Sequence, residues 1–246
     1  MTYRPFHTDG ATRPARWLVT CDHATNTVPP FVGDGSLGLP ETDMARHIAY
    51  DVGAKGVARE LARRLDGPAI CANFSRLVID PNRGEDDPTL LMKLYDGSVI
   101  PGNRHAGPGE LEKRLNGCYR PYHTALAELA ARRDDTVIVS VHSFTPQLRG
   151  RPPRPWHVGL LYAADRRLAR PLLARMRQDP DLCVGENEPY GGHLPGDAIA
   201  RHAIAWERPN ILIELRNDLI RTESQQAAWA ARLAPMLAEA AETAGV

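Results

Sequence analysis

The sequence lacks several features that would assign it to a familiar class of protein. None of its apolar runs approaches the roughly 20 residues that a membrane-spanning helix needs, and the first ten residues, MTYRPFHTDG, contain no apolar segment typical of a secretion signal. The 30 basic and 30 acidic residues cancel, so net charge favours neither nucleic acid nor an anionic membrane as the main partner. We therefore expect a cytoplasmic protein whose partner is a small molecule or another protein.

Several motifs that carry chemistry are also absent. The four cysteines are far apart and form no CxxC pair, which indicates a reduced, cytoplasmic protein. The glycines between residues 191 and 196 lack the GxGxxG and GxxxxGK[ST] spacings, and there is no G-x-S-x-G segment. The sequence thus predicts no dinucleotide site, no P-loop and no serine nucleophile of the elbow type.

The chain instead contains short apolar runs that alternate with helical segments. Short runs rich in Val, Ile, Leu and Thr are typical of strands buried on both faces of a sheet. The alternation predicts a three-layer α/β fold with a mixed central sheet in a single domain, residues 1–246. The runs predict strands at 17–22, 69–80, 136–143, 156–163, within 181–196 and at 210–218, and helices at 41–65, 110–133, 165–178 and 223–244, with breaks or kinks at Pro121 and Pro235.

Three of the predicted strands end on side chains able to do chemistry: His23, His142 and Glu214. Ligands of open α/β sheets bind outside the carboxyl ends of the strands, so these side chains should converge. One histidine at a strand end would more simply be structural, but two of them with a third ligand could hold a catalytic zinc ion. Asn26 is the third candidate by position, although an amide is a poor zinc ligand and Asp22 or another histidine could replace it.

Glu214 lies within the apolar segment ILIEL, where a buried carboxylate must be paired or bound to something. Near a divalent metal it could activate water and return the proton to a leaving nitrogen, as a general base and then acid. The alternative is an ion pair with Arg216, two positions along on the same face of the strand. Arg216 is itself a candidate for contact with the substrate.

Two arginines flank the end of the segment SRLVIDPNR and are candidates for holding an acidic substrate. The planar guanidinium fork of Arg76 or Arg83 matches a carboxylate. Either arginine could instead pair with Asp80. Of the remaining histidines, His123 and His202 are interpreted as core or cap residues.

His47 and Asp51 are four positions apart on the predicted helix 41–65 and would therefore be neighbours on its surface. The carboxylate could orient the imidazole beside the substrate; the alternative is an exposed contact worth only tenths of a kcal/mol. Asn103 lies in the long irregular stretch 81–109 and is predicted to reach a ligand. Loops of this length in compact domains are usually functional or disordered.

Taken together, the segments CDHATNTVP, FSRLVIDPNR, VSVHSFTP, GENEPYGG and IELRNDLI resemble the N-formylglutamate amidohydrolase family. The resemblance implies a phosphorylase/hydrolase-like fold related to the zinc carboxypeptidases and cleavage of N-formyl-L-glutamate to formate and L-glutamate in histidine degradation. It implies that His23 and His142 are metal ligands and that Glu214 is the general base. Asn26 stands where that wider group carries a glutamate.

The sequence therefore predicts a hydrolase that uses a divalent metal ion, zinc, to cleave a small, acidic N-acyl amino acid, with N-formyl-L-glutamate as the default substrate. One alternative is a related hydrolase of another N-acyl amino acid or peptide-like amide. A second alternative is a non-catalytic binding protein that has kept the pocket and lost the metal.

Overall fold

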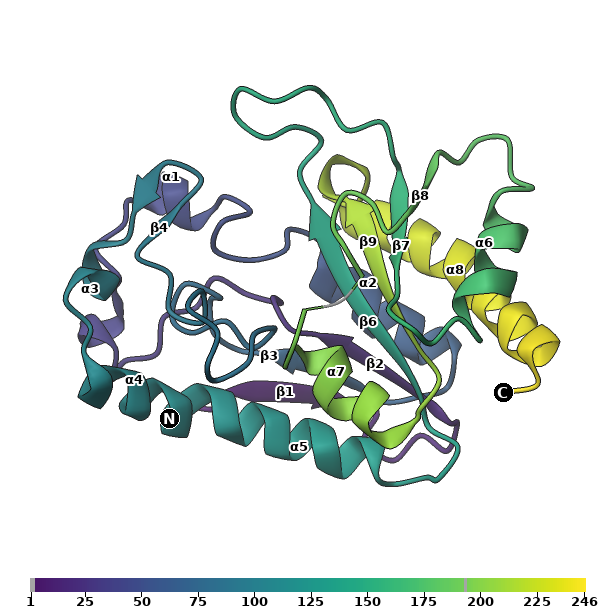
Figure 1. The fold of residues 1–246 in the computed structure, drawn as a ribbon, viewed down its shortest axis with the longest axis horizontal. Helices are drawn as coiled ribbons and strands as arrows, with labels where there is room; N and C mark the ends of the chain where they lie inside the picture. Colours follow the sequence, from purple (N-terminus) through teal and green to yellow (C-terminus); the bar gives the residue numbers. More distant parts are fainter. Residues whose placement is uncertain (1–2, 193) are drawn as a thin grey trace.

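A seven-stranded mixed sheet forms the centre of the molecule in the computed structural model, which describes residues 3–192 and 194–246 (Figure 1). Its strands are β1 (Phe6–Asp9), β2 (Trp17–Cys21), β3 (Ala69–Ala72), β6 (Val137–Phe144), β7 (Val158–Leu161), β8 (Val184–Glu186) and β9 (Asn210–Arg216). They lie in the order β1-β3-β2-β6-β9-β7-β8. The four central strands, β3, β2, β6 and β9, run parallel, whereas β1 is antiparallel to β3 and β7 is antiparallel to β9.

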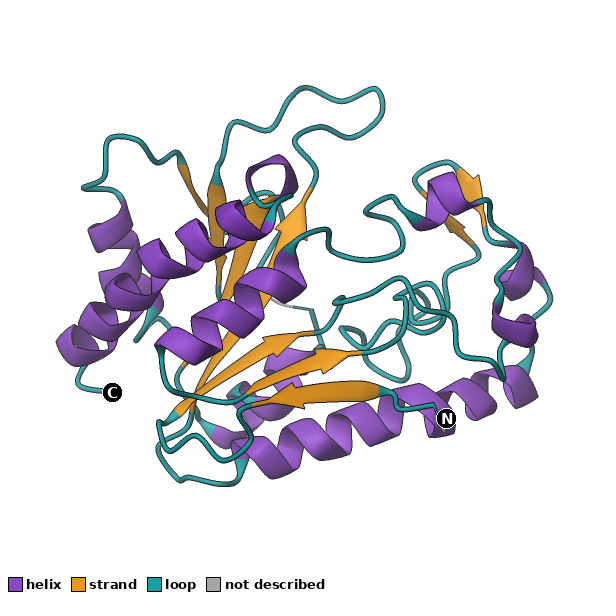
Figure 2. Ribbon diagram, turned by 180° about the vertical axis from the view of Figure 1, so that it is seen from behind, coloured by secondary structure: helices purple, strands orange, loops and turns teal. Residues whose placement is uncertain are grey.

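Helices cover both faces of this sheet. The helices are α1 (Glu41–Met44), α2 (Ala54–Arg64), α3 (Pro101–Arg104), α4 (Pro108–Arg114), α5 (Arg120–Ala130), α6 (Ala169–Met176), α7 (Ala198–His202) and α8 (Glu223–Ala244). Helices α2, α6 and α8 lie on one side of the sheet, and α5 and α7 lie on the other (Figure 1, Figure 2). Side chains of the first group belong to one apolar core and side chains of the second group to another. The predicted three-layer α/β architecture with a mixed sheet is therefore confirmed.

The period of two along each strand determines which side chains meet at the carboxyl edge of the sheet. Val139 and Val141 of β6 join the core beneath α2 and α8, while Ile138 joins the opposite core beneath α5. His142 therefore points to the same side as Ile138, and Glu214 is its register partner on β9. Polar side chains thus replace apolar ones where these two strands end.

The predicted helix 41–65 is wrong over its middle part. Helix α1 ends at Met44, the chain then turns irregularly, and α2 begins only at Ala54 after Gly53, whose φ is 82°. A Cβ atom at this glycine would lie 2.1 Å from the backbone oxygen of Ile220, so only glycine fits this left-handed turn. Asp51 therefore lies in a loop rather than on a helix surface.

The predicted strand 69–80 is also wrong beyond β3. After Ala72 the chain leaves the sheet, and its backbone groups bond to other loops: Ser75 N to Thr27 O, Arg76 N to Ala49 O and Asp80 N to Leu90 O. The residues are apolar because they are buried under irregular chain, which a periodicity argument does not distinguish from a strand.

Several short elements were not predicted. They include β1, α3, α7 and a small hairpin formed by β4 (Leu94–Tyr95) and β5 (Ser98–Val99). A π-helical turn, Leu115–Tyr119, precedes Pro121 at the predicted break, whereas α8 continues through Pro235 without the predicted interruption. Among the described residues, none of the helices combines the length and the apolar character that crossing a membrane demands.

Candidate metal and catalytic site

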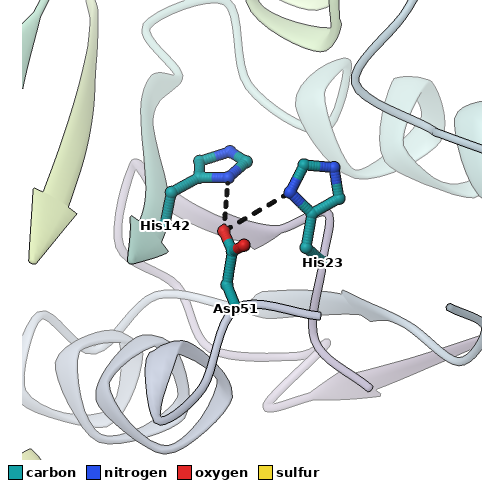
Figure 3. A group of neighbouring side chains, drawn as sticks. All are labelled: His23, Asp51 and His142. Carbon is teal, nitrogen blue, oxygen red and sulfur yellow. Dashed lines mark hydrogen bonds and ion pairs between the residues drawn. The ribbon is translucent and has the colours of Figure 1, made fainter. Parts of the chain in front are cut away.

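Three buried side chains converge at the carboxyl edge of the sheet (Figure 3). His23 follows β2, Asp51 lies in the loop before α2, and His142 belongs to β6. Oδ2 of Asp51 lies 2.9 Å from Nδ1 of His142 and 3.4 Å from Nδ1 of His23. One potential ligand atom from each residue lies within 4.8 Å of the others. The predicted convergence of the two histidines is thus present in the structure.

The second nitrogen of each imidazole has its own polar partner. Nε2 of His23 lies 2.7 Å from Oδ1 of Asp80. Nε2 of His142 lies 3.1 Å from Oγ of Ser140 and 3.4 Å from Oδ2 of Asp22. Such outer partners fix the orientation of metal-binding histidines and leave the other ring nitrogen for the metal. Both Nδ1 atoms accordingly face Asp51.

Backbone contacts explain why Asp51 reaches the site from an irregular loop. Its N–H donates to the carbonyl oxygen of His23 at 2.8 Å. The N–H of Ser143 donates to Oδ2 of Asp51 at 3.2 Å, and the Ser143 hydroxyl donates to the carbonyl oxygen of Val52 at 3.0 Å. The loop is therefore attached to the ends of both strands that carry the histidines.

The electrostatics of the group are dominated by buried carboxylates. Burial alone would raise the pKa of Asp51, but the neighbouring His23 and His142 outweigh it and hold that pKa well below its usual range. Burial would lower the pKa of His142, yet its hydrogen bonds to Asp22 and Asp51 raise that pKa well above the usual value. Asp80 has a lowered pKa because Arg76 and His23 outweigh the effect of its burial. Without a cation, the carboxylates stabilise a proton on His142.

The donor set fits a divalent metal ion. Two imidazoles and one carboxylate are a common protein contribution to catalytic zinc sites, which keep a further position open. Oδ1 of Asp51 is buried and has no hydrogen-bond partner among the described residues. Its nearest charged neighbours are Nδ1 of His47 at 3.5 Å and Nη1 of Arg76 at 3.7 Å. Oδ2 of the same carboxylate faces both imidazoles, so the group presents an anionic oxygen to a cation held by the two histidines.

Asn26, the position predicted for the third ligand, does not belong to this group. Its side chain is exposed, and its amide donates to the carbonyl oxygen of Met44 at 2.9 Å. Asp51 occupies the third place instead, because the irregular loop after α1 returns to the end of β2. Asp51 was predicted only as a partner of His47 beside the substrate.

Glu214 of β9 lies beside His142 of β6 and does not belong to the group formed by His23, Asp51 and His142. Its Oε2 is buried and has no hydrogen-bond partner in the part of the chain that the structure describes, and burial raises the pKa of this carboxyl group to about 8. The alternative ion pair with Arg216 is not formed: Nε of Arg216 lies 2.8 Å from Oδ1 of Asp218. The other side of this guanidinium faces the backbone oxygens of 154–156.

A cavity of about 340 Å³ opens directly onto this group, within the range of roughly 300–1,000 Å³ that is usual for small-molecule sites. Its lining includes nearly all of the predicted site residues: His23, His47, Asp51, Arg76, Arg83, His142 and Glu214. Asn26, Asn103 and Arg216 are not among the lining residues.

The two predicted substrate arginines reach the cavity in different ways. Nη2 of Arg76 lies 2.8 Å from Oδ2 of Asp80, and the guanidinium carbon lies 5.5 Å from the ring centre of Tyr95. Arg76 therefore does pair with Asp80, but its Nε has no hydrogen-bond partner among the described residues. Arg83 is half-buried and donates to the carbonyl oxygen of Asn82 and to the hydroxyl of Thr89.

Asn103 is buried away from the cavity and stabilises the loop that carries the arginines. Its amide donates to the carbonyl oxygens of Leu77 and Met92, each at 2.7 Å, and its Oδ1 accepts from the buried Arg114 at 2.7 Å. These bonds join α3 to the irregular segment 74–92. The structure thus places Asn103 in a supporting position, because a fully buried amide satisfies backbone groups that no strand or helix pairs.

Sequence reasoning missed the aromatic residues of the site and the double contact of Asp80. Tyr95 and Tyr190 line the cavity from the β4–β5 hairpin and the loop after β8. The hydroxyl of Tyr190 lies 3.2 Å from Nη1 of Arg154. The available signals were weak: a tyrosine in a glycine-rich loop, and a carboxylate directly after the buried segment RLVI.

Comparison with known proteins connects this geometry to a family. The chain is similar to the N-formylglutamate amidohydrolase family over residues 15–221. It is 28% identical over 209 residues to an N-formylglutamate deformylase from Pseudomonas putida, with 75% of this chain and 73% of that protein covered.

Two solved structures share the fold along almost the full chain. A gene product of Agrobacterium tumefaciens is 33% identical with a TM-score of 0.93, covering 99% of this chain and 97% of that chain. An N-formylglutamate amidohydrolase from Ralstonia eutropha is 22% identical with a TM-score of 0.76, covering 98% of this chain and 99% of that one. The second similarity concerns the fold alone.

Proposed function

The chain belongs to the N-formylglutamate amidohydrolase family, and we propose that it is a metal-dependent amidohydrolase that cleaves N-formyl-L-glutamate to formate and L-glutamate. His23, Asp51 and His142 would hold the metal, with zinc as the cofactor. When bound, a divalent metal supplies a Lewis acid for the scissile carbonyl group and lowers the pKa of water. The family and the donor set support this proposal.

Glu214 performs the proton transfers of the reaction. It is buried and it lines the cavity, and burial raises its pKa without a cation. A divalent cation held beside it would favour the ionised carboxylate, which is the form that acts as a general base. It removes a proton from the attacking water as the water oxygen bonds to the formyl carbon. The C–N bond then breaks, and Glu214 returns the proton to the leaving nitrogen. Formate and a free amino acid result.

Arg76 and Arg83 bind the carboxylates of the substrate. Asp80 contacts both Arg76 and His23, at 2.8 and 2.7 Å, so it orients a substrate arginine and a metal-binding histidine at once. Movement of either partner would be transmitted to the other through one carboxylate. Asp80 is accordingly a positioning residue for both halves of the site.

The surroundings exclude bulk water from the reacting groups. His23 and His142 are each 2% exposed and Glu214 is 7% exposed, while Leu161, Ile199 and Leu212 supply apolar walls. Charges in such a site interact more strongly than in water. The apolar walls thus strengthen both the hold on a cation and the contacts to substrate carboxylates.

The proposal depends on the meeting of both Nδ1 atoms at one carboxylate, with Oε2 of Glu214 in the same cavity and without a hydrogen-bond partner among residues 3–192 and 194–246. Release of the free amino acid by zinc- or cobalt-loaded protein tests it, with N-formyl-L-glutamate, N-acetyl-L-glutamate, N-formyl-L-aspartate and N-formyl-L-leucine as separate substrates. Among these four single amino acids we expect the highest kcat/KM for N-formyl-L-glutamate. A higher value for another N-acyl amino acid would support the alternative substrate, and no turnover of any member would contradict the proposed activity.

A further inference from the structure

A second cavity, of about 500 Å³, adjoins the one that contains the candidate metal site. His47 and Tyr95 line both cavities, so the two meet at these side chains. The second cavity extends between the loop after α1, the β4–β5 hairpin and the loop after β6. Space of this size beside a reaction centre is more than a formyl amino acid needs.

The lining of the second cavity is positively charged. It includes Arg46, Arg149 and Arg221, with Asp96 as the one acidic lining residue. Arg46 is already paired, at 2.6 Å from Asp96 and 3.0 Å from Asp43. Arg149 and Arg221 form no ion pair within residues 3–192 and 194–246. The two unpaired arginines give the cavity a preference for anions.

His47 stands at the junction with a polar atom that lacks a partner. Its side chain is 9% exposed, and its Nδ1 has no hydrogen bond among the described residues. The nearest charged atom, Oδ1 of Asp51, is 3.5 Å away. A buried polar atom without a partner costs stability, and a ligand that crosses from one cavity to the other would supply that partner.

We propose that the second cavity binds the carboxyl-terminal residue of an acidic N-acyl dipeptide, so that the enzyme accepts N-formyl-L-glutamyl-L-glutamate in addition to the single amino acid. This inference rests on the proposed amidohydrolase activity. Arg76 and Arg83 hold the first residue, a peptide bond passes His47, and Arg149 and Arg221 contact the carboxylates of the second residue. The second cavity would therefore make the enzyme prefer acidic peptides to neutral ones.

The bond that breaks is the same in both substrates. Water adds across the formyl amide: its oxygen bonds to the formyl carbon, the C–N bond breaks, and a proton goes to the leaving nitrogen. The products are formate and free L-glutamyl-L-glutamate. The second residue contributes binding alone, so its effect appears in kcat/KM.

The test compares formate release from N-formyl-L-glutamate, N-formyl-L-glutamyl-L-glutamate and N-formyl-L-glutamyl-L-alaninamide, whose second residue carries no charge, with metal-loaded protein. We expect kcat/KM for the acidic dipeptide to exceed that for the other two compounds. Exposed charge pairs are weak individually, so Arg149→Gln and Arg221→Gln should each lower the ratio of kcat/KM for the acidic dipeptide to kcat/KM for the single amino acid by about twofold to fivefold. Arg151→Gln is the matched control, because Arg151 is exposed in the same loop and lines neither cavity.

Binding of L-glutamyl-L-glutamate, measured by calorimetry on the same four proteins, separates this inference from the proposed function. Binding that weakens in Arg149→Gln and Arg221→Gln supports the anionic subsite even if no formyl compound is hydrolysed. Two results would overturn the subsite. One is hydrolysis of N-formyl-L-glutamate without a preference for the acidic dipeptide, which leaves the proposed function standing. The other is an affinity for L-glutamyl-L-glutamate that is the same in wild type, Arg149→Gln and Arg221→Gln.

Discussion

Two pairs of buried histidines lie among the residues that the structure describes, and they differ in what surrounds them. His23 and His142 face a shared carboxylate, and each has a further carboxylate or hydroxyl behind it. His123 of α5 and His202 of α7 instead bond to each other at 2.8 Å, with their rings stacked at 15°. Burial lowers the pKa of His123 to about 3 and that of His202 to about 4, whereas the pKa of His142 is raised.

The carboxylates, rather than the histidines, distinguish the candidate metal site from the second pair. Both pairs are buried to a similar degree, at 2–4% exposure. The pair without bonded carboxylates stays neutral and joins two helices, as expected for the core or cap histidines that the sequence suggested. The pair with carboxylates concentrates negative charge at one point, which a divalent cation would neutralise.

The largest expected effect is the loss of catalytic activity when Glu214 is replaced. Glu214→Gln keeps the shape of the side chain and removes its ability to exchange a proton, so kcat for formate release should fall by roughly 10²- to 10⁴-fold. Metal content, measured by inductively coupled plasma mass spectrometry, should stay at the wild-type level. Activity close to wild type would contradict the role of Glu214 as general base.

The carboxylate behind His23 should affect the metal more moderately. Asp80→Asn removes the negative charge that contacts Nε2 of His23. It should weaken zinc binding by about 10- to 100-fold, the usual cost of losing a residue that orients a metal ligand. Competition with a chromogenic chelator measures this. His202→Gln is the control, and its zinc affinity should equal that of wild type; equal losses in both variants would mean that the two histidine pairs do not differ as described.

The histidine pair His123 and His202 should make the free energy of unfolding depend on pH. The pKa of His202 is about 4 in the folded protein and about 6.5 in the unfolded chain. The contribution of neutral His202 to the free energy of unfolding is therefore complete above pH 6.5 and is lost as pH falls toward 4. Between pH 7 and pH 5 the wild type should lose about 2 kcal/mol more stability than His202→Gln, at about 1.4 kcal/mol per pH unit. Urea unfolding at both pH values measures the difference, and parallel losses would show that folding does not lower the pKa of His202.

The smallest effect is expected at the position that spacing alone suggested as a ligand. Asn26→Ala removes one exposed hydrogen bond to Met44, which is worth about 0.5–1.5 kcal/mol of stability at most. Zinc affinity, measured by the same chelator competition, should change by less than about threefold. A loss as large as that of Asp80→Asn would place Asn26 in the metal site after all.

The sequence carried enough information to predict the parts of the site that lie on regular strands. β6 and β9 are buried on both faces, so they begin as short continuous apolar runs in the sequence, and the polar residues His142 and Glu214 that follow these runs are readable without a structure. His23 follows directly from the end of β2. These three residues therefore meet where the strand ends predicted them to meet.

The rest could not be predicted because irregular loops supply it. Asp51 and Asp80 are positioned by backbone hydrogen bonds to His23 and Leu90, and such pairings between loops leave no periodic pattern in the sequence. The interpretation of 41–65 as one helix followed from its apolar spacing and overlooked the left-handed turn at Gly53. Asn26 and Arg216 were predicted from their spacing to His23 and Glu214 in the sequence. In the folded protein their side chains instead contact Met44 and Asp218.

Metal titration of the metal-free protein tests the central claim most directly. Zinc or cobalt added in increments should restore formate release from N-formyl-L-glutamate and saturate near one ion per chain, a stoichiometry set by the one His/His/Asp group found among the described residues. His142→Ala should neither bind the ion nor gain activity, while His202→Gln should behave as wild type. A metal-free protein that binds no ion, or that binds zinc or cobalt and stays inactive, would contradict the proposed mechanism.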